Sequence, residues 1–323
     1  METVACNLCG SERCTTVYTM PDRLFPAAEM FTVVECAECG LGFVNPRPTV
    51  SEMQKYYPPE YFSASASKNS ERYFQRRFAA EAKYLETIVP SGKVKRLLDV
   101  GCATGEFPRF MAARGWEVEG VEVSVAAREI SDFRVYTEEF QRIPVNEPYY
   151  DAVTAWAVLE HVHDPMAYFR KAARVLKPGG FFVFLVTNFQ SAASRHLFCE
   201  DVPRHLYFFT RETVERYLRD SGFELLKERN GRDVYKLAPN NWLAFMVRTK
   251  LLGRHYSFQD VPMTSKEFRR SRNLPKELRS ALRYAAYSPL SVLDRMLWPV
   301  VESVQILRQN YGISTYVARK LGR

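Results

Sequence analysis

Short apolar runs alternate with amphipathic stretches in the middle of the chain. Residues 94–100 form an apolar run that ends at the glycine-containing turn 101–105, and residues 106–115 then have the spacing of a helix. A second apolar run follows at 117–124. A buried strand, a glycine turn and a helix in this order predict the first unit of a doubly wound, mostly parallel α/β sheet.

The same alternation continues on both sides of this unit. Residues 149–165 predict a strand that runs into the start of a helix, and residues 175–188 predict a tight turn followed by another buried strand. Upstream, residues 71–89 have apolar side chains at near-helical spacing, which predicts an amphipathic helix. The serine-rich stretch 63–70 predicts a flexible linker. With 323 residues and 46% hydrophobic content, the chain can form one large domain with additions.

Cysteines are concentrated at the N-terminal end. Five of the seven lie within the first 39 residues, and four of these form two C-x2-C pairs, each followed directly by a glycine. Glycine accepts the positive φ of a tight knuckle, and four thiolates at this spacing predict a closed, structural zinc site. Disulfides are disfavoured because the chain shows no secretory pattern. The predicted zinc ligands are Cys6, Cys9, Cys36 and Cys39.

Basic residues are concentrated at the other end. Residues 240–323 hold 15 lysines and arginines against 5 acidic residues, whereas the net charge of the whole chain is only +8. The preceding part is therefore slightly acidic. Two stretches of the basic region also carry bulky apolar residues, which fits either a helical lid over the active site or a helix at an anionic membrane surface.

Membrane-spanning and secretory segments are not expected. The longest apolar run, 180–189, is about half of what a bilayer-spanning helix requires. The first residues lack a basic start followed by an apolar stretch, so no secretory signal is predicted. We expect a cytoplasmic protein, with peripheral contact at the inner face of the membrane left open.

The turn after the first predicted strand has chemistry of its own. Gly101 and Gly105 form a G-x-x-x-G pattern, and Glu122 lies 21 residues after Gly101. An acid at this spacing suits ribose hydroxyls, so the pattern alone fits a dinucleotide or another adenosine ligand. The turn lacks the third glycine of G-x-G-x-x-G. Asp99 at the strand end would repel a pyrophosphate but suits an ammonium group or a bound water.

Several segments in a fixed order resemble the class I S-adenosylmethionine-dependent methyltransferases. They are the run from Asp99 to Gly105, then Glu122, and the segments YDAV, VLEHV and LKPGGFFVF, within about 94–226. The resemblance implies a Rossmann-like, seven-stranded α/β sheet, with residues 222–230 as the sixth strand and 312–320 as the seventh. The residues between these two strands then form an insertion.

The same resemblance assigns roles to single residues. It implies S-adenosylmethionine as cofactor, with its amino-acid end over the glycine loop, Asp99 at the methionyl ammonium, usually through water, and Glu122 at the ribose. An acid after the third strand is expected at the adenine, where Glu139 is the preferred match and Glu138 competes.

A narrower resemblance concerns the acceptor. The four cysteines, a following GFVNPRP connector with paired tyrosines and a late His-x-Tyr-Phe segment are similar to the zinc-containing sugar methyltransferases, including deoxysugar C-methyltransferases. In those enzymes a Glu-His pair occupies the late position, and its histidine is implicated in proton abstraction. This chain has His205 there but Arg204 in place of the acid. The departure argues against direct C-methylation and leaves O-methylation open.

Two histidines are candidates to remove a proton from the acceptor. A hydroxyl or carbon acceptor needs a base with a pKa near neutrality, which histidine provides. His161 follows the strand edge where the reactive methyl group is expected, and His205 lies between the fifth strand and the next helix. Each histidine could instead pack in the core or cap a helix. Tyr57 and Tyr61 are candidates to close over the site.

We therefore expect methylation of oxygen or carbon on a small-molecule or lipid-linked saccharide acceptor. An RNA methyltransferase is the alternative within enzymes, but the slightly acidic first 239 residues disfavour nucleic acid. A non-catalytic, zinc-organised binding module is the alternative outside enzymes. The expected parts are a zinc-binding module and connector (1–62), a linker and helix (63–93), the cofactor-binding core (94–237), a basic helical insertion (238–310) and the final strand (311–323).

Overall fold

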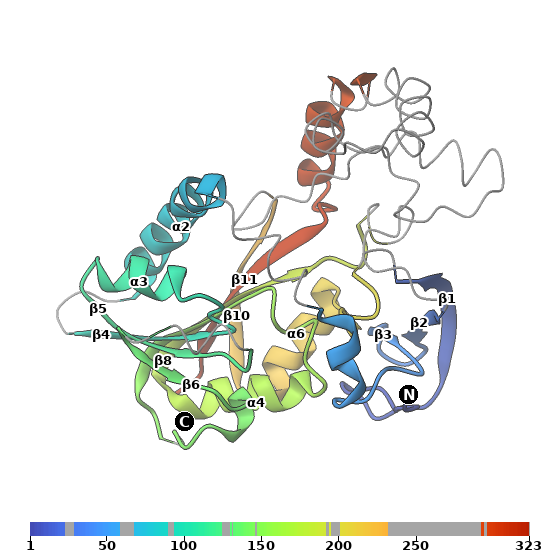
Figure 1. The fold of residues 1–323 in the computed structure, drawn as a ribbon, viewed down its shortest axis with the longest axis horizontal. Helices are drawn as coiled ribbons and strands as arrows, with labels where there is room; N and C mark the ends of the chain where they lie inside the picture. Colours follow the sequence, from blue (N-terminus) through green and yellow to red (C-terminus); the bar gives the residue numbers. More distant parts are fainter. Residues whose placement is uncertain are drawn as a thin grey trace.

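The computed structural model describes most of the chain, and its fold is drawn in Figure 1. The described residues are 1–22, 29–58, 68–89, 94–124, 130, 132–145, 147–191, 194, 201–231, 292–293 and 296–322. Two expectations lie largely outside them: the linker at 63–70 and the basic insertion up to residue 291. Tyr61 also lies outside the described residues.

A seven-stranded sheet forms the centre of the molecule, as the sequence predicts. Its order is β10-β11-β8-β7-β4-β5-β6. The five strands from β8 to β6 are parallel, and β11 and β10 are antiparallel to their neighbours. The strands are β4 (Lys95–Val100), β5 (Trp116–Val121), β6 (Arg134–Tyr136), β7 (Tyr150–Trp156), β8 (Leu176–Thr187), β10 (Phe223–Asn230) and β11 (Ile313–Lys320).

This strand order fixes where a ligand can bind. The chain leaves β4 toward one edge of the sheet and returns to the other side of β4 at β7, so the order reverses between these two strands. In open α/β sheets, ligands bind beyond the carboxyl ends of the strands at such a reversal. The glycine turn follows β4 directly, and the segment that carries His161 follows β7.

Helices pack on the two faces of the sheet (Figure 1). Helices α2 (Lys68–Ile88) and α3 (Glu106–Ala112) contribute Phe78, Leu85 and Phe107 to one hydrophobic cluster. Helices α4 (Pro165–Val175) and α6 (Arg211–Asp220) contribute to the other cluster, where Phe169 stacks on Tyr217. Helix α2 begins at residue 68, so residues 68–70 of the expected linker are helical.

The N-terminal module shares its sheet with the rest of the chain. Strands β1 (Cys14–Pro21), β2 (Met30–Cys36) and β3 (Gly42–Val44) pair in order, and β3 also pairs with β9 (Tyr207–Phe208). Strand β9 comes from the segment between β8 and α6. Apolar side chains of the module and of α4 and α6 belong to one continuous hydrophobic cluster. The module therefore packs directly against α4, α6 and the segment that carries His205.

The connector after the module is fixed by one arginine. Arg47 Nε donates to Glu2 at 2.7 Å, while its guanidinium also donates to the carbonyl of His163 at 2.9 Å and to the Tyr207 hydroxyl at 2.8 Å. Such a fork of donors joins three separate segments at once. The short 3₁₀ helix η1 (Glu52–Tyr56) then leads to Tyr57.

A helix at 296–307 precedes the last strand. Its inner side packs Trp298 and Ile306 against the α2 and α3 cluster, while Glu302 is buried and accepts a hydrogen bond from the Tyr311 hydroxyl. The helix exposes Met296, Val300, Val304 and Leu307, and Val292, which lies before it, is exposed as well; these five residues form the apolar stripe. Among the described helices, none has the length and apolar character needed to cross a membrane.

Candidate active site

The glycine loop between β4 and α3 has the backbone that a close ligand approach requires. Gly101 and Gly105 have φ values of +70° and +81°, in the left-handed region that favours glycine. A Cβ atom on Gly101 would lie 2.5 Å from Cγ2 of Val158. The loop therefore touches the turn that follows β7, which places the candidate cofactor loop next to His161.

Two acids lie beside this loop. The Glu122 carboxylate, just after β5, accepts hydrogen bonds from the amides of Ala103 at 2.9 Å and Ser124 at 2.8 Å. Asp99, the fifth residue of β4, is only 2% exposed and accepts a hydrogen bond from Thr154 Oγ1 at 2.5 Å. Burial raises the pKa of Asp99 to about 8, and the nearby Glu122 charge adds to this shift. Such a carboxyl group suits a cationic ligand, because a cation stabilises its ionised form.

The two candidate histidines lie together. The rings of His161 and His205 are 4.6 Å apart, edge to face. Nδ1 of His161 lies 3.1 Å from the Tyr57 hydroxyl and 3.1 Å from the backbone carbonyl of Arg204. A carbonyl can only accept, so this contact assigns the proton to Nδ1 and leaves the Nε2 lone pair available. Burial, with the neighbouring His205, lowers the pKa of His161 to about 3, so its ring is neutral at physiological pH.

A carboxylate that the sequence analysis did not single out completes this group. Glu160 is fully buried, and one side-chain ligand atom from each of Glu160, His161 and His205 lies within 4.8 Å of the others. The backbone carbonyl of Glu160 accepts from the amides of Leu206 at 2.7 Å and Tyr207 at 3.2 Å. Position 204, directly before His205, holds an arginine instead of the expected acid. The carboxylate of Glu160, from the segment that carries His161, lies near the His205 ring.

Comparison with known proteins gives the family of the chain. The sequence profile of a family described as "Methyltransferase domain" matches residues 71–228. The "Ubiquinone biosynthesis O-methyltransferase" of Acinetobacter baylyi is 30% identical over 182 residues, which cover 48% of this chain and 76% of that protein. The chain belongs to the S-adenosylmethionine-dependent methyltransferases.

Other relatives match a smaller part. Proteins of the same name from Alkalilimnicola ehrlichii and Nitrosomonas europaea are 38% and 34% identical, over 42% and 49% of their own lengths. The chain thus spans about half the length of these relatives. Among solved structures, a SAM-dependent methyltransferase from Archaeoglobus fulgidus has a TM-score of 0.50 and 15% identity, covering 81% of this chain and all of that one. At this identity the likeness shows the fold alone.

The remaining acid predicted for this methyltransferase lies farther along the same sheet edge. Glu139 follows β6, accepts a hydrogen bond from Gln141 Nε2 at 2.8 Å and pairs with Arg142 at 3.3 Å. These are local partners, and its adenine role stays a prediction. Phe133, which the sequence analysis did not select, would meet a Cβ on Gly105 at 2.8 Å. The glycine there leaves room for this ring at the side of the loop.

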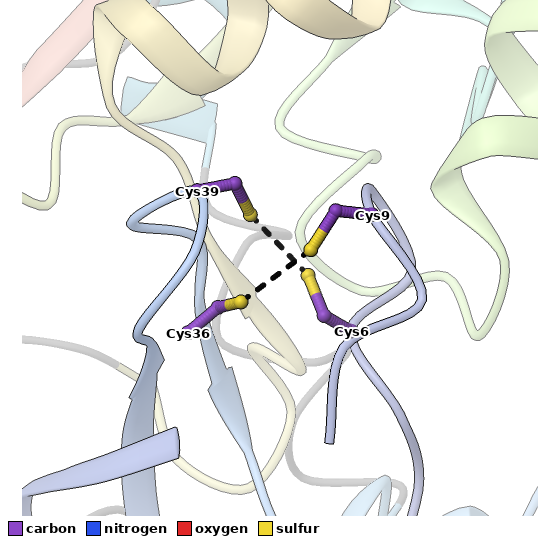
Figure 2. Close-up of side chains that lie close together, drawn as sticks. All are labelled: Cys6, Cys9, Cys36 and Cys39. Atoms are coloured by element: carbon purple, nitrogen blue, oxygen red, sulfur yellow. Dashed lines mark hydrogen bonds between the residues drawn. The ribbon is translucent and has the colours of Figure 1, made fainter. Parts of the chain in front are cut away.

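The four predicted zinc ligands converge on one point (Figure 2). Their sulfur atoms lie within 4.8 Å of one another, with Cys6 3.4 Å from Cys39 and Cys9 3.5 Å from Cys36. These S···S separations are longer than a disulfide bond. They approach the separation of about 3.8 Å between two sulfur atoms that bind one tetrahedral zinc ion at about 2.3 Å each. The donor set therefore fits a structural zinc ion.

The two knuckles have matching backbones. Gly10 donates to the carbonyl of Cys6 at 2.8 Å, and Gly40 donates to that of Cys36 at 2.9 Å, with positive φ at both glycines. Between the first two cysteines, Asn7 reaches the core. Its side-chain oxygen accepts from the Met166 amide at 3.0 Å and from the Tyr217 hydroxyl at 2.9 Å. Formation of the knuckle and docking of the module are thus coupled.

Replacement of Glu122 should weaken cofactor binding. In Glu122→Gln the side chain keeps its shape but loses the charge that suits the ribose hydroxyls, and hydrogen bonds to charged groups are worth about 1.5–3 kcal/mol. We expect the dissociation constant for S-adenosylmethionine to rise about 10- to 100-fold in calorimetric titrations. Glu117→Gln, at an exposed acid near the other end of β5 that pairs with Arg96, is the control and should bind like the parent. Equal affinity in parent and Glu122→Gln would place the ribose elsewhere.

The raised pKa of Asp99 gives cofactor binding a pH dependence. Below about pH 8 this carboxyl group is largely protonated in the free protein, whereas a bound ammonium group favours its ionised form. Binding then releases a proton, so affinity should rise between pH 6 and pH 8 by about tenfold per pH unit at most. Titration calorimetry at several pH values measures this slope. Asp99→Asn should bind more weakly and lose the slope, and an identical slope in that variant would contradict the assignment.

Proposed function

We propose that the protein transfers a methyl group from S-adenosylmethionine to a hydroxyl group of a saccharide, nucleotide-sugar or glycolipid-type acceptor. The observation that carries the proposal is the contact between His161, His205 and Tyr57 beside the turn that touches Gly101. The glycine loop, Asp99 and Glu122 would hold the cofactor, which supplies a methyl group activated on a sulfonium centre. In-line transfer then depends mainly on alignment and on removal of the acceptor proton.

His205 is the preferred proton acceptor. A ring whose conjugate acid has a pKa of about 3, as burial imposes on His161, holds a transferred proton poorly. His161 is better suited to orient the acceptor or the neighbouring His205 ring through its own Nε2 lone pair. Glu160, with its carboxylate near both rings, would favour the protonated form of a histidine after transfer. Tyr57 would cover the side of the site that faces the N-terminal module.

Oxygen is the favoured methylated atom. The relatives at 30% identity are named O-methyltransferases, and the acid before His205 in sugar C-methyltransferases is replaced by Arg204. Their name also supports a second candidate acceptor, a phenolic hydroxyl of a lipid. The saccharide is preferred because the four cysteines, the GFVNPRP connector and the segment of His205 resemble the zinc-containing sugar methyltransferases. The hydroxyl and imidazole groups of Tyr57, His161 and His205 also suit a polar acceptor.

A panel of acceptors tests the proposal. The protein is incubated with S-adenosylmethionine and, separately, nucleotide sugars, glycolipids and catechol-type phenols, and S-adenosylhomocysteine is quantified. We expect turnover with a saccharide-containing acceptor and a mass increase of one methylene group in the product. Turnover with the phenols alone would replace the saccharide by the second candidate. No turnover with any hydroxyl acceptor, while an RNA is methylated, would overturn both.

We also propose peripheral contact with an anionic membrane through the region before the last strand. The exposed stripe of Val292, Met296, Val300, Val304 and Leu307 and the surplus of basic residues after 240 support it. Replacement of Val300 and Leu307 by serine should reduce sedimentation with anionic liposomes and leave methylation of a soluble acceptor unchanged. A parent protein that ignores such liposomes at low salt would leave only the lid interpretation.

A further inference from the structure

Arg204 directly precedes His205, at the position where the resemblance to the sugar methyltransferases predicts an acid, and its guanidinium is held by an ion-pair network of its own. The residue is 0% exposed. Its guanidinium forms a two-pronged ion pair with Asp22, at 2.8 Å to Oδ2 and 2.7 Å to Oδ1. It also pairs with Asp201 at 2.6 Å and donates to the backbone carbonyl of Tyr56 at 2.9 Å. One cation thus faces two carboxylates.

These partners come from three separate parts of the chain. Asp22 directly follows β1 of the cysteine module, Tyr56 ends the 3₁₀ helix η1, and Asp201 belongs to the segment between β8 and α6. Removal of the Asp22 carboxylate would leave the buried guanidinium paired with Asp201 alone and would break the two-pronged contact to the end of β1, which is unfavourable for a buried ion pair. The planar fork also fixes the direction of each partner more tightly than a lysine could. The guanidinium therefore holds the module and the late segment in one relative position.

Two residues of this network are immediate neighbours of members of the histidine group, that is, of Tyr57, Glu160, His161 and His205. Tyr56 precedes Tyr57, whose hydroxyl lies 3.1 Å from His161 Nδ1. Arg204 precedes His205, and its own carbonyl lies 3.1 Å from the same Nδ1 atom. The amide of His205 donates to the carbonyl of Asp201 at 2.7 Å. The backbone before Tyr57 and the backbone before His205 are thus both tied to the guanidinium of Arg204.

We propose that Arg204 is a positioning residue that assembles the acceptor site from the cysteine module and the core through its buried ion pair with Asp22. The proposal rests on the proposed function for the role of the histidine group. In this arrangement the cofactor loop is independent of the module, because none of the contacts of Arg204 named above reaches Gly101, Glu122 or Asp99. Loss of the ion pair should therefore disturb the acceptor site and spare the cofactor site.

The test uses the full-length protein labelled with ¹⁵N in its histidines. The chain has five histidines, so the ring signals of His161 and His205 can be assigned with single His→Gln variants. In Asp22→Asn we expect shifted or broadened signals for both rings, with S-adenosylmethionine affinity within about twofold of the parent. On an acceptor from the panel, kcat should fall about 10²-fold, as a misplacement of about 1 Å can cause.

Two further variants make the result decisive. Glu38→Gln makes the same acid-to-amide change at an exposed ion pair inside the module, the one with Arg13, and should leave the ring signals unchanged. If Asp22→Asn does not fold, Arg204→Lys, which keeps the charge without the fork, should shift the same two signals. Unchanged ring signals in a folded Asp22→Asn or Arg204→Lys protein would overturn the proposal. The ring signals report on assembly without turnover, so this outcome is distinct from failure of the acceptor panel.

Discussion

Replacement of His205 by alanine is expected to lower turnover by about 10²–10⁴-fold, the usual contribution of a positioned general base. The ring centroids of His205 and His161 lie 4.6 Å apart. His205 is preferred because burial lowers the pKa of His161 to about 3, so that ring holds a proton poorly. Because the cofactor loop lies on other elements, S-adenosylmethionine affinity should stay near that of the parent. Steady-state kinetics and a calorimetric titration on the same protein measure both quantities.

A matched histidine serves as the control. His163 lies two residues after His161, and its Nε2 contacts the carbonyl of Pro48 at 3.1 Å instead of the histidine group. His163→Gln should therefore retain most of the turnover. If His205→Ala turns over like the parent while His161→Gln does not, the proton acceptor is His161. If neither variant is impaired, the acceptor group ionises without a base from this histidine pair.

Removal of the zinc ligands is expected to have the largest effect on stability. Sulfur atoms of the four cysteines converge within 4.8 Å, and the module shares a hydrophobic cluster with α4 and α6. Metal-binding energy in such sites is folding energy. Cys36→Ser should lose the metal and lower the melting temperature by roughly 10 °C, which corresponds to about 3–5 kcal/mol for a domain of this size. Metal analysis and thermal unfolding measure the two effects.

Another cysteine of the same module is the control. Cys14, on β1, is not one of the four grouped thiols. Cys14→Ser should keep one zinc ion per chain and the parent melting temperature. Two results together would contradict the structural zinc assignment: protein purified without chelators contains no zinc, and added zinc does not change its melting temperature.

The sequence predicted the sheet well because its signals are local. The run at 94–100 corresponds to β4 and is followed by the predicted glycine turn, and the strands that the resemblance implies at 222–230 and 312–320 correspond to β10 and β11 within a residue. The second strand ends at Val121, earlier than expected, because the chain turns where the Glu122 carboxylate accepts the amides of Ala103 and Ser124. The cysteine knuckles were equally readable, since spacing and the following glycine define them.

The acceptor side was harder to predict because its contacts join distant segments. Strand β9 completes the sheet of the module from more than 160 residues away, and no local pattern marks two residues as such a strand. Arg204 could be recognised from sequence only as a missing acid. Its partner Asp22 lies 182 residues earlier, and a single sequence carries no information on that pairing. Glu160 was inside a recognised motif, but its distance to His205 depends on the fold.

A calorimetric titration of the parent protein with S-adenosylmethionine tests the account most directly. The placement of Asp99, Glu122 and the glycine loop predicts one binding site per chain, with affinity lost in Glu122→Gln and retained in His205→Ala. This pattern would establish that cofactor binding and proton removal occupy separate residues at one edge of the sheet. Absence of heat from the parent, or equal binding by Glu122→Gln, would contradict the account at its centre.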